Sequence, residues 1–537
     1  MPRRVRRVPL RRGLRPDRPG RPRGQRRVRV RRGRRGHARD VRPRRGLRAR
    51  HRGQARLPSV RRAPGAGELA APHRGTGGRP RQPVDDRVHG GRRGAAAERT
   101  GRGVIAHVPR RVWSGTGLLV LGRLFGSACT LATLFLLAQR LAGDGFGRFT
   151  FYLALFMVLD SFVDLGTGQV LVQRTADDPQ AVAPMLGAAR RIRLATGVIG
   201  VLAVGSGAFL AGEPGAVWIL VASLYPLTHV LELSTIVFKN RIAWAKPVVV
   251  RAVASGASLA FVVAFLAAGV RAPELFLVAI AMGSAIGNLL LHLASRSHLP
   301  RRVGPVAPLR PFLRNALPIG LAGLCQQTYF YIDNLFVRGI EGATAVGHYN
   351  VAVRIMSFGI MVAVFAPLAA LPWLTREHAA GRLGVAAARL AQPLFALAGL
   401  ALGLLWGFCE PLLALFGAGF AAAGDTLRWL LLACLAVYVG ATFLTAVVAS
   451  GRARGVLGVA AAGLAVNLIG NSALVPRMGI EGAAAATLAT EIAVVLGAAM
   501  VLARVGAHPL RSRPWAWLGG PALFLLGATV SSALSAS

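Results

Sequence analysis

Two arginines lie inside long apolar segments, far from the polar residues at either end. Arg123 is about ten residues into the segment 113–138, and Arg354 is about eight residues into the segment 346–372. A charge within a membrane-spanning helix is costly, so each arginine is a candidate for binding a ligand. The guanidinium group stays charged and binds phosphate oxygens in a bidentate way. If both face one cavity, they form a cationic site for a phosphate group; otherwise each pairs with a neighbouring acid or a backbone carbonyl.

Four acidic side chains also lie in such segments: Asp160, Asp164, Asp333 and Glu491. Asp160 and Asp164 are four residues apart and therefore share one helix face. They could bind a coupling Na⁺ or H⁺, or neutralise Arg123 on the adjacent helix, and we favour this ion pair for Asp164. Glu491 lies in the middle of its segment and is the best candidate for a protonatable coupling site. Asp160 and Asp333 are the other candidates for ion coupling.

The segment 312–337 is the most polar of the apolar segments. Its polar side chains include Gln326, Gln327, Tyr329 and Tyr331. They lie on several faces of a helix, as in the wall of a water-filled cavity. We expect Gln326, Gln327 and Tyr331 to bind hydroxyl groups of a ligand. We expect three asparagines in other segments to form hydrogen bonds between helices: Asn288, Asn467 and Asn471.

Thirteen apolar segments position these residues. A membrane-spanning helix needs about 20 predominantly apolar residues, and so many in succession exclude a soluble fold. The predicted spans are 113–138, 146–171, 188–211, 214–234, 247–270, 273–294, 312–337, 346–372, 386–408, 426–449, 455–474, 480–503 and 515–533. We predict an all-α polytopic membrane protein with twelve core helices and a thirteenth at the C-terminus. Arg251 lies near one end of its span, so we expect it to snorkel to the interface.

Basic residues gather in every second loop between the spans, which indicates the orientation of the chain. They are Arg174, Arg190, Arg191, Arg193, Lys239, Arg241, Lys246, Arg296, Arg301, Arg302, Arg310, Arg314, Arg376, Arg382, Arg452, Arg454, Arg504, Arg511 and Arg513. The other loops are short and carry few cations. Because cytoplasmic loops are the ones enriched in Lys and Arg, we predict that the basic loops and the N-terminus are cytoplasmic.

The longest basic loop, 295–311, divides the twelve core spans into two sets of six. At an offset of 200 residues, the segment 146–149 (FGRF) matches the segment 346–349 (VGHY). Halves of like orientation are related by an axis along the membrane normal, with a substrate site between them near the midplane. We predict two six-helix lobes around a central cavity. The expected limits are 112–300 for the N-terminal lobe, 301–505 for the C-terminal lobe and 506–537 for an extra transmembrane helix.

Residues 1–111 have a different composition, with 37 arginines, no lysine and six acidic residues. Such a segment cannot bury enough apolar surface to fold, so we predict a disordered basic extension. It has no apolar core of a secretion signal. One interpretation is an arm that binds RNA or anionic lipid headgroups. We favour the other, a GC-rich reading frame extended upstream of a native start near Val104, and we predict no nucleic-acid partner.

The chain carries few signs of covalent chemistry. Its four cysteines are scattered without a CxxC spacing: Cys129, Cys325, Cys409 and Cys434. We therefore predict no metal site, no cofactor and no disulfide framework. The sequence has no Walker A loop and no nucleophile elbow. These features favour a transporter over an enzyme.

Several motifs resemble those of one transporter superfamily. The stretch 467–487 (NLIGNSALVPRMGIEGAAAAT) is similar to the pattern N-x-x-x-N-x-x-L-x-P-x-x-G-x-x-G-A-A-x-A-T of polysaccharide (O-antigen-type) flippases. These belong to the multidrug/oligosaccharidyl-lipid/polysaccharide exporter superfamily. Four further stretches match in order: 164–169, 317–333 with its Pro and Tyr-Ile-Asp, 415–420 and 449–452. The resemblance covers about 113–505.

The resemblance implies a flippase of the inner or plasma membrane. It would move a lipid-linked (polyprenyl-diphosphate) oligosaccharide by alternating access, for the biosynthesis of lipopolysaccharide or another polysaccharide. The expected partners are this glycan substrate, membrane lipids, and a glycan polymerase and glycosyltransferases of the same pathway. One alternative is a multidrug/toxin cation antiporter, which an acidic cavity would favour. Another is a membrane glycosyltransferase or ligase, but the longest external loop, 409–425, is apolar and rich in glycine.

Overall fold

The computed structural model describes residues 110–141, 143–176, 178–241, 243, 245–299 and 306–536. These residues form α-helices joined by short turns, with no strand in the described ranges. The predicted fold class, an all-α polytopic membrane protein, is confirmed. Nearly all of the basic extension 1–111 lies outside the described residues, as does the predicted lobe boundary at 300–301. The domain limits therefore stay predictions.

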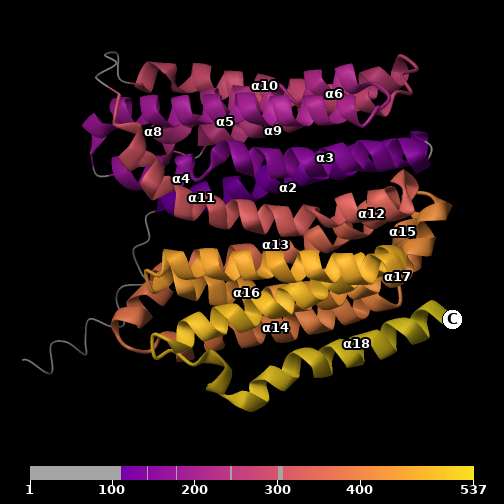
Figure 1. The fold of residues 1–537 in the computed structure, drawn as a ribbon. Helices are drawn as coiled ribbons and strands as arrows, with labels where there is room; N and C mark the ends of the chain where they lie inside the picture. The colour runs from indigo at the N-terminus through magenta and orange to yellow at the C-terminus, as the bar shows by residue number, and fades with distance from the viewer. Residues whose placement is uncertain are drawn as a thin grey trace, which may run out of the picture. The chain divides into compact units, whose positions relative to one another are not determined.

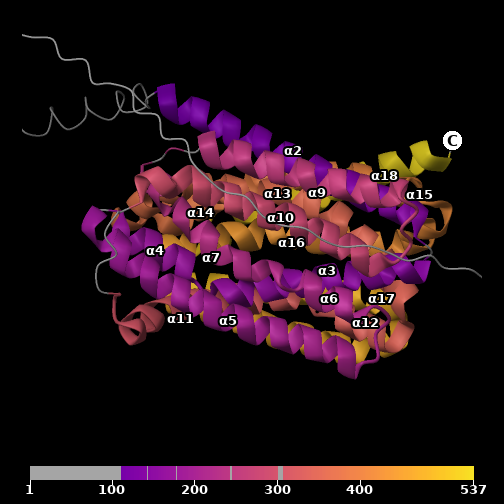
Figure 2. The same cartoon turned by 90° about the horizontal axis from the view of Figure 1, so that it is seen from above.

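The helices fall into two lobes followed by one extra helix (Figure 1). The N-terminal lobe comprises α2 (Arg110–Arg140), α3 (Gly143–Asp164), α4 (Thr167–Thr175), α5 (Val182–Leu210), α6 (Ala216–Ala222), α7 (His229–Glu232), α8 (Ile236–Lys239), α9 (Ala245–Ala267) and α10 (Pro273–Ser295). The C-terminal lobe comprises α11 (Leu309–Tyr331), α12 (Asp333–Glu341), α13 (Ala343–Ala379), α14 (Leu383–Trp406), α15 (Cys409–Ala414), α16 (Gly424–Ala449) and α17 (Ala453–Ala503), and α18 (Gly519–Ala536) follows. Figure 2 shows α2 alongside α9, against which it packs.

Eleven helical segments are long and apolar enough to cross a membrane. The predicted total of thirteen is larger for two physical reasons. The α11–α12 segment carries Gln326, Gln327 and several charged residues, so it is less apolar than the other spans. Helix α17 is a single segment by length, but it crosses twice.

Helix α17 runs for 51 residues, and the backbone of Gly479 interrupts it with φ 58° and ψ −135°. A straight helix of this length would extend about 75 Å, far beyond the thickness of a bilayer. Instead, the two halves return alongside each other, so that Gly455 near one end contacts Val501 near the other. Glycine adopts a positive φ readily because it has no Cβ atom. Gly479 therefore separates the predicted eleventh and twelfth spans.

The fourth span, Ala216–Lys239, is not a regular helix. Two 3₁₀ turns, Tyr225–Thr228 and Leu233–Thr235, separate α6, α7 and α8. Pro226 in the first turn lacks the amide hydrogen that a continuous helix would use. This irregular backbone lets His229 face α3 and Glu232 face α5.

The extra helix α18 docks on two glycines of α14, Gly399 and Gly403, and on Gly407, which directly follows α14. A Cβ atom at any of them would lie 2.2 to 2.4 Å from the backbone of α18. Their spacing of four residues puts them on one face, where small residues let helices approach closely. The Ser531 hydroxyl donates to the carbonyl oxygen of Gly403 at 3.0 Å. The C-terminal segment is thus a thirteenth helix packed on the C-terminal lobe.

The two lobes meet where α3 crosses α13. A Cβ atom on Gly147 would lie 1.7 Å from the carbonyl oxygen of Ala343, and one on Gly347 would lie 3.2 Å from the ring of Phe146. Phe146, Gly147 and Gly347 belong to the segments 146–149 and 346–349, and Ala343 directly precedes the second segment, so the lobes contact each other at or next to matching positions. This crossing is at the end of the bundle with the short, cation-poor loops, hereafter the short-loop end. The opposite end is hereafter the basic end.

A second contact between the lobes lies toward the basic end, where α3 gives way to α4. Leu165 and Gly166 adopt left-handed backbone conformations, with φ of 42° and 74°. A Cβ atom on Gly320 of α11 would lie 2.4 Å from the carbonyl oxygen of Leu165. Asp164 accepts a hydrogen bond from the backbone N–H of Gly168 at 3.2 Å, which stabilises the start of α4. The stretch 164–169, which resembles the flippase family, therefore forms a helix break at the contact between the lobes.

Candidate functional site

A cavity of about 730 Å³, hereafter the central cavity, lies between α2, the fourth span and α9 of one lobe and α13 of the other. Lys239 and Pro247, which flank the loop between α8 and α9, line it, so the cavity reaches toward the basic end. Its charged lining residues are Arg123, Lys239, Arg251, Arg354 and Glu232. Its volume is within the range of about 300–1,000 Å³ that is typical of ligand sites. The cavity therefore has an excess of positive charge.

Arg123 and Arg354 enter the central cavity from different lobes. The guanidinium of Arg123 lies 4.6 Å from the centroid of the Phe365 ring on α13, a cation–π contact between the lobes. Neither arginine forms an ion pair or a hydrogen bond with any residue in the described ranges. The alternative in which each pairs with an acid or a carbonyl is thus not observed there. Their N–H groups are available to a ligand, and substrate binding by them stays a prediction.

Arg251 also lines the central cavity, and its snorkelling to the interface stays a prediction. Its guanidinium pairs with Glu232, whose other carboxylate oxygen lies 3.7 Å from Arg193. Arg193 in turn pairs with Asp164. Arg193 of α5 therefore neutralises Asp164. The predicted ion pair between Asp164 and Arg123 is wrong. The break between α3 and α4 explains this, because it turns Asp164 toward Arg193.

The predicted hydroxyl-binding residues of α11 are not brought together. Gln326 is exposed and Gln327 is half-buried, and neither lines the central cavity. Tyr331 lines a narrow space next to Arg354, together with Asn350 of α13. Of these three residues, Tyr331 alone lies beside the candidate site in this conformation.

Asp333 at the start of α12 is 1 % exposed and accepts four hydrogen bonds. Its Oδ2 atom accepts from Tyr349 at 2.5 Å and from Thr487 at 2.9 Å, and its Oδ1 atom accepts from Asn467 at 3.0 Å and from Asn471 at 2.7 Å. The partners come from α13 and from both halves of α17. The prediction that Asn467 and Asn471 form hydrogen bonds between helices is confirmed.

Glu491 lies one helical turn beyond Thr487 on the same face of α17. It is buried, close to Tyr329 of α11 and Cys434 of α16. Its carboxylate forms no ion pair or hydrogen bond within the described part of the chain. Glu491 and Asp333 thus lie near one another in the C-terminal lobe, away from the central cavity.

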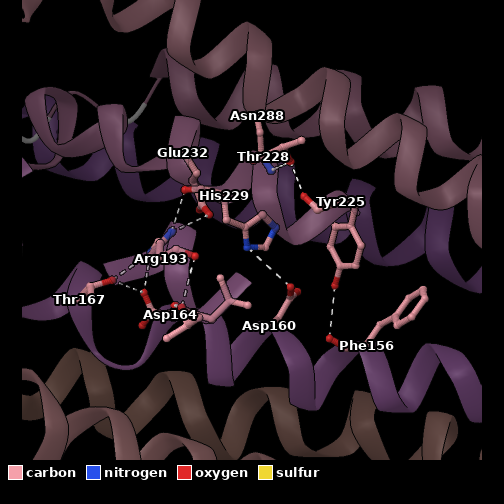
Figure 3. A network of polar contacts seen from close by, with 12 residues as sticks. Phe156, Asp160, Asp164, Thr167, Arg193, Tyr225, Thr228, His229, Glu232 and Asn288 are labelled. Carbon is pink, nitrogen blue, oxygen red and sulfur yellow. Dashed lines mark hydrogen bonds and ion pairs between the residues drawn. The ribbon is translucent and has the colours of Figure 1, made fainter. Parts of the chain in front are cut away.

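Asp160 lines a second cavity of about 310 Å³ inside the N-terminal lobe, hereafter the side chamber. His229 of the fourth span faces Asp160, with its Nδ1 atom 3.6 Å from the carboxylate (Figure 3). Glu232 and Arg251 border both the side chamber and the central cavity. The ion pair between them therefore stands where the two spaces adjoin.

An apolar groove of about 590 Å³ lies next to the central cavity, between α2 and the helices α13, α14 and α16. Its lining side chains include Leu131, Phe135, Leu402 and Phe416. Phe358 of α13 lines both the groove and the central cavity. A molecule with a polar part and a long apolar part could thus contact both spaces at once.

The short-loop end is closed by polar contacts in addition to the crossing of α3 and α13. Arg338 of α12 pairs with Glu213, which lies between α5 and α6 in the other lobe. The same guanidinium lies 4.6 Å from the centroid of the Phe151 ring on α3. These contacts join the lobes at the end opposite to the loop that borders the central cavity.

Two family models match the chain. One is described as "Polysaccharide biosynthesis protein" and matches residues 112–378, and the other is described as "MatE" and matches residues 318–473. Together they extend from the first span to the eleventh. No curated protein sequence matches the chain at a significant level.

Several solved structures have a similar fold. A structure described as "Lipid II flippase MurJ, inward closed conformation" has a TM-score of 0.62 at 13% sequence identity, covering 78% of this chain and 98% of its own. An inward-facing multidrug resistance MATE family transporter of the MOP superfamily has a TM-score of 0.55 at 16% identity, covering 70% and 95%. A MOP superfamily transporter from Pyrococcus furiosus, whose structure is described as having a binding pocket of reverse polarity, has a TM-score of 0.57 at 15% identity, covering 73% and 94%. At these identities the similarity establishes the fold alone.

Proposed function

The chain belongs to the multidrug/oligosaccharidyl-lipid/polysaccharide exporter superfamily, and from this premise we propose that it flips a lipid-linked oligosaccharide across the inner or plasma membrane. Its fold and family are those of a transporter rather than an enzyme. The substrate would carry a polyprenyl tail, a diphosphate and a glycan. No bond of the substrate needs to form or break during this movement.

The observation that carries the proposal is the pairing of a cationic cavity with an apolar groove. Four cationic side chains and one acidic side chain line the central cavity, and Phe358 joins it to the groove. A diphosphate group suits unpaired arginines because it presents several oxygens to each guanidinium. The groove suits a polyprenyl tail because its lining is apolar, like the lipid around the tail. The site thus has a part for each end of an amphiphilic substrate.

The charge of the central cavity argues against the cation antiporter. An organic cation would approach Arg123 and Arg354, which no carboxylate neutralises in the described ranges. In a site of low dielectric constant, contact between like charges is strongly unfavourable. A diphosphate would be attracted by the same arrangement.

The arrangement of the lobes supports alternating access as the mechanism. The short-loop end is held shut by the α3–α13 crossing and by the pair of Arg338 with Glu213, while the central cavity reaches the basic end. With the basic loops in the cytoplasm, this conformation would receive the glycan from the cytoplasmic side. Rocking of the lobes would then open the short-loop end, while the polyprenyl tail stays in lipid.

The class of ligand can be tested on the purified protein in nanodiscs. We expect farnesyl diphosphate to bind and to raise the melting temperature, since a ligand that binds only the folded state stabilises it. Tetraphenylphosphonium, an organic cation of similar apolar size, should produce no such rise. A rise with the cation and none with the diphosphate would contradict the proposal and favour the antiporter.

We further propose that the C-terminal lobe couples transport to Na⁺ or H⁺ through Asp333, with Glu491 as a second participant. Asp333 is buried against side-chain oxygens and amides of Tyr349, Thr487, Asn467 and Asn471, which join α12 and α13 to both halves of α17. Adding or removing a cation there would change the hydrogen bonds that hold these helices together.

A substitution of Asp333 separates coupling from structure. In the wild type, we expect added Na⁺ or a lower pH to raise the melting temperature by ligand linkage. Asp333→Asn should abolish this rise and the matching dependence of transport on the ion, while Asn350→Ala, next to the site but outside it, should keep both. An ion-dependent rise of equal size in Asp333→Asn would contradict the coupling role, even if the variant is less stable.

The proposal also gives the chain its partners. The substrate must be made by glycosyltransferases on the loading side, and the product is suited to a glycan polymerase on the other side. Membrane lipids would contact the many exposed apolar side chains of the spans, such as Leu202, Leu210 and Leu397.

A further inference from the structure

The side chamber contains two buried acceptor oxygens that accept no hydrogen bond from a described residue, although one of them, Asp160 Oδ1, lies 3.6 Å from His229 Nδ1. Asn288 is 1 % exposed, and its Nδ2 atom donates to the Thr228 hydroxyl at 2.9 Å, but its Oδ1 atom has no hydrogen-bond partner in the described part of the chain. The Oδ1 atom of Asp160 likewise accepts no hydrogen bond there. A buried acceptor left unpaired destabilises the fold. Two such oxygens lining one cavity of about 310 Å³ indicate a ligand that brings its own donors.

The walls of the side chamber are partly aromatic. The rings of Phe156 and Tyr225 have centroids 5.7 Å apart, and Tyr225 and His229 follow at 5.5 Å. Figure 3 shows His229 between Asn288 and Asp160, with Tyr225 beside it and donating to the backbone oxygen of Phe156 at 3.3 Å. A flat apolar wall with acceptors near its edges matches a sugar ring, which has C–H groups on its faces and hydroxyl donors around its rim.

The charges around the chamber argue against a metal ion or an organic cation. Glu232 is already paired with Arg251 and lies 3.7 Å from Arg193, so its charge is neutralised. The guanidinium of Arg251 borders the space directly. In the described ranges, no three His, Cys, Asp or Glu side chains come together in a group that could hold a metal ion. Asp160, facing His229, is the one carboxylate left to accept from a neutral ligand.

We propose that the side chamber is a sugar subsite, which holds the sugar ring nearest the diphosphate of the lipid-linked glycan and prefers a neutral ring to a uronic acid. The inference rests on the proposed flippase function. The chamber adjoins the central cavity through Glu232 and Arg251, so a ring bonded to a diphosphate at Arg123 and Arg354 is the part of the substrate next to it. A carboxylate on that ring would face Asp160 and be repelled.

Binding to matched ligands in nanodiscs tests the subsite. The probes are farnesyl diphosphate, its glucose derivative and its glucuronic acid derivative. In the wild type, we expect the glucose derivative to bind about tenfold more tightly than farnesyl diphosphate, as one hydrogen bond to a buried acceptor can supply, and the glucuronic acid derivative to lose this gain. Asn288→Leu should remove the gain and leave the affinity for farnesyl diphosphate unchanged. Thr228→Val, which deletes the same Asn288–Thr228 hydrogen bond but keeps the Asn288 carbonyl, should retain the gain.

A second variant keeps the test decisive if Asn288→Leu fails to fold. Asp160→Asn should raise the affinity for the glucuronic acid derivative toward that of the glucose derivative. Equal affinity of the wild type for farnesyl diphosphate and its glucose derivative would overturn the sugar subsite alone. Equal weakening of both ligands in Asn288→Leu would do the same. If farnesyl diphosphate itself does not bind, the proposed function fails and the inference fails with it.

Discussion

Replacement of Arg354 by alanine should weaken binding of a polyprenyl diphosphate roughly 30- to 150-fold, which corresponds to about 2–3 kcal/mol for a charge-assisted hydrogen bond to a diphosphate oxygen. Surface polysaccharide in cells that depend on this protein should fall to background. Arg354 forms no ion pair or hydrogen bond within the described ranges, so its removal leaves no other group unsatisfied. The variant should therefore insert into the membrane and melt as the wild type does.

Two further variants show whether the effect is specific to the site. Arg354→Lys keeps the charge but loses the bidentate geometry, so its affinity for the polyprenyl diphosphate should lie between those of the wild type and Arg354→Ala. Arg271→Ala removes an exposed arginine at the short-loop end and should change neither binding nor polysaccharide. Normal surface polysaccharide in Arg354→Ala would remove this residue from the substrate site.

The second large effect is expected at the contact between the lobes. In Gly147→Ala, the added Cβ atom would lie 1.7 Å from the carbonyl oxygen of Ala343, so α3 and α13 must separate at the short-loop end. Overpacking of this kind costs about 1–3 kcal/mol. We expect the population of the closed short-loop end to fall roughly 5- to 150-fold and flipping to fall accordingly, while the helices of each lobe remain folded.

Distances between spin labels in the two lobes measure this shift. Labels at Arg271 and Glu341 report on the short-loop end, and labels at Lys246 and Arg376 report on the basic end; all four side chains are exposed. In Gly147→Ala the first distance should increase and the second should decrease. Gly145→Ala is the matched control, because its Cβ atom would meet its nearest neighbour at an ordinary 3.7 Å. Unchanged distances in Gly147→Ala would show that this crossing does not set the conformation.

The sequence predicts most of this fold because membrane-spanning helices satisfy a local rule. Each needs a sufficient run of apolar residues, which can be counted without knowing any contact. The twofold arrangement was also visible in the matching segments 146–149 and 346–349, which the structure brings together. The irregular fourth span was not predicted, since its 3₁₀ turns depend on packing within the lobe.

The candidate site is harder to derive, because the sequence does not show which residues a charged side chain within a span will contact. The cost of an intramembrane charge pointed to Arg123 and Arg354, and the same rule applied to Arg251 and Glu232 would have found the ion pair that borders the cavity. The break after Asp164 could not be located from periodicity, and it redirects that carboxylate to α5. Gln326 and Gln327 show the opposite error, because polar residues on several faces of a helix need not face the same space.

Translocation of the head group in proteoliposomes tests the central claim most directly. A fluorescent polyprenyl-diphosphate oligosaccharide is placed in vesicles that contain the purified protein, and a lectin or reductant added outside reports how much of it has crossed. The account predicts rapid crossing with the wild-type protein and crossing at the protein-free rate with Arg354→Ala. Two results would contradict a cationic cavity that carries a diphosphate-linked glycan. One is that the head group crosses no faster with the wild-type protein than in empty vesicles, and the other is that it crosses as fast with Arg354→Ala as with the wild type.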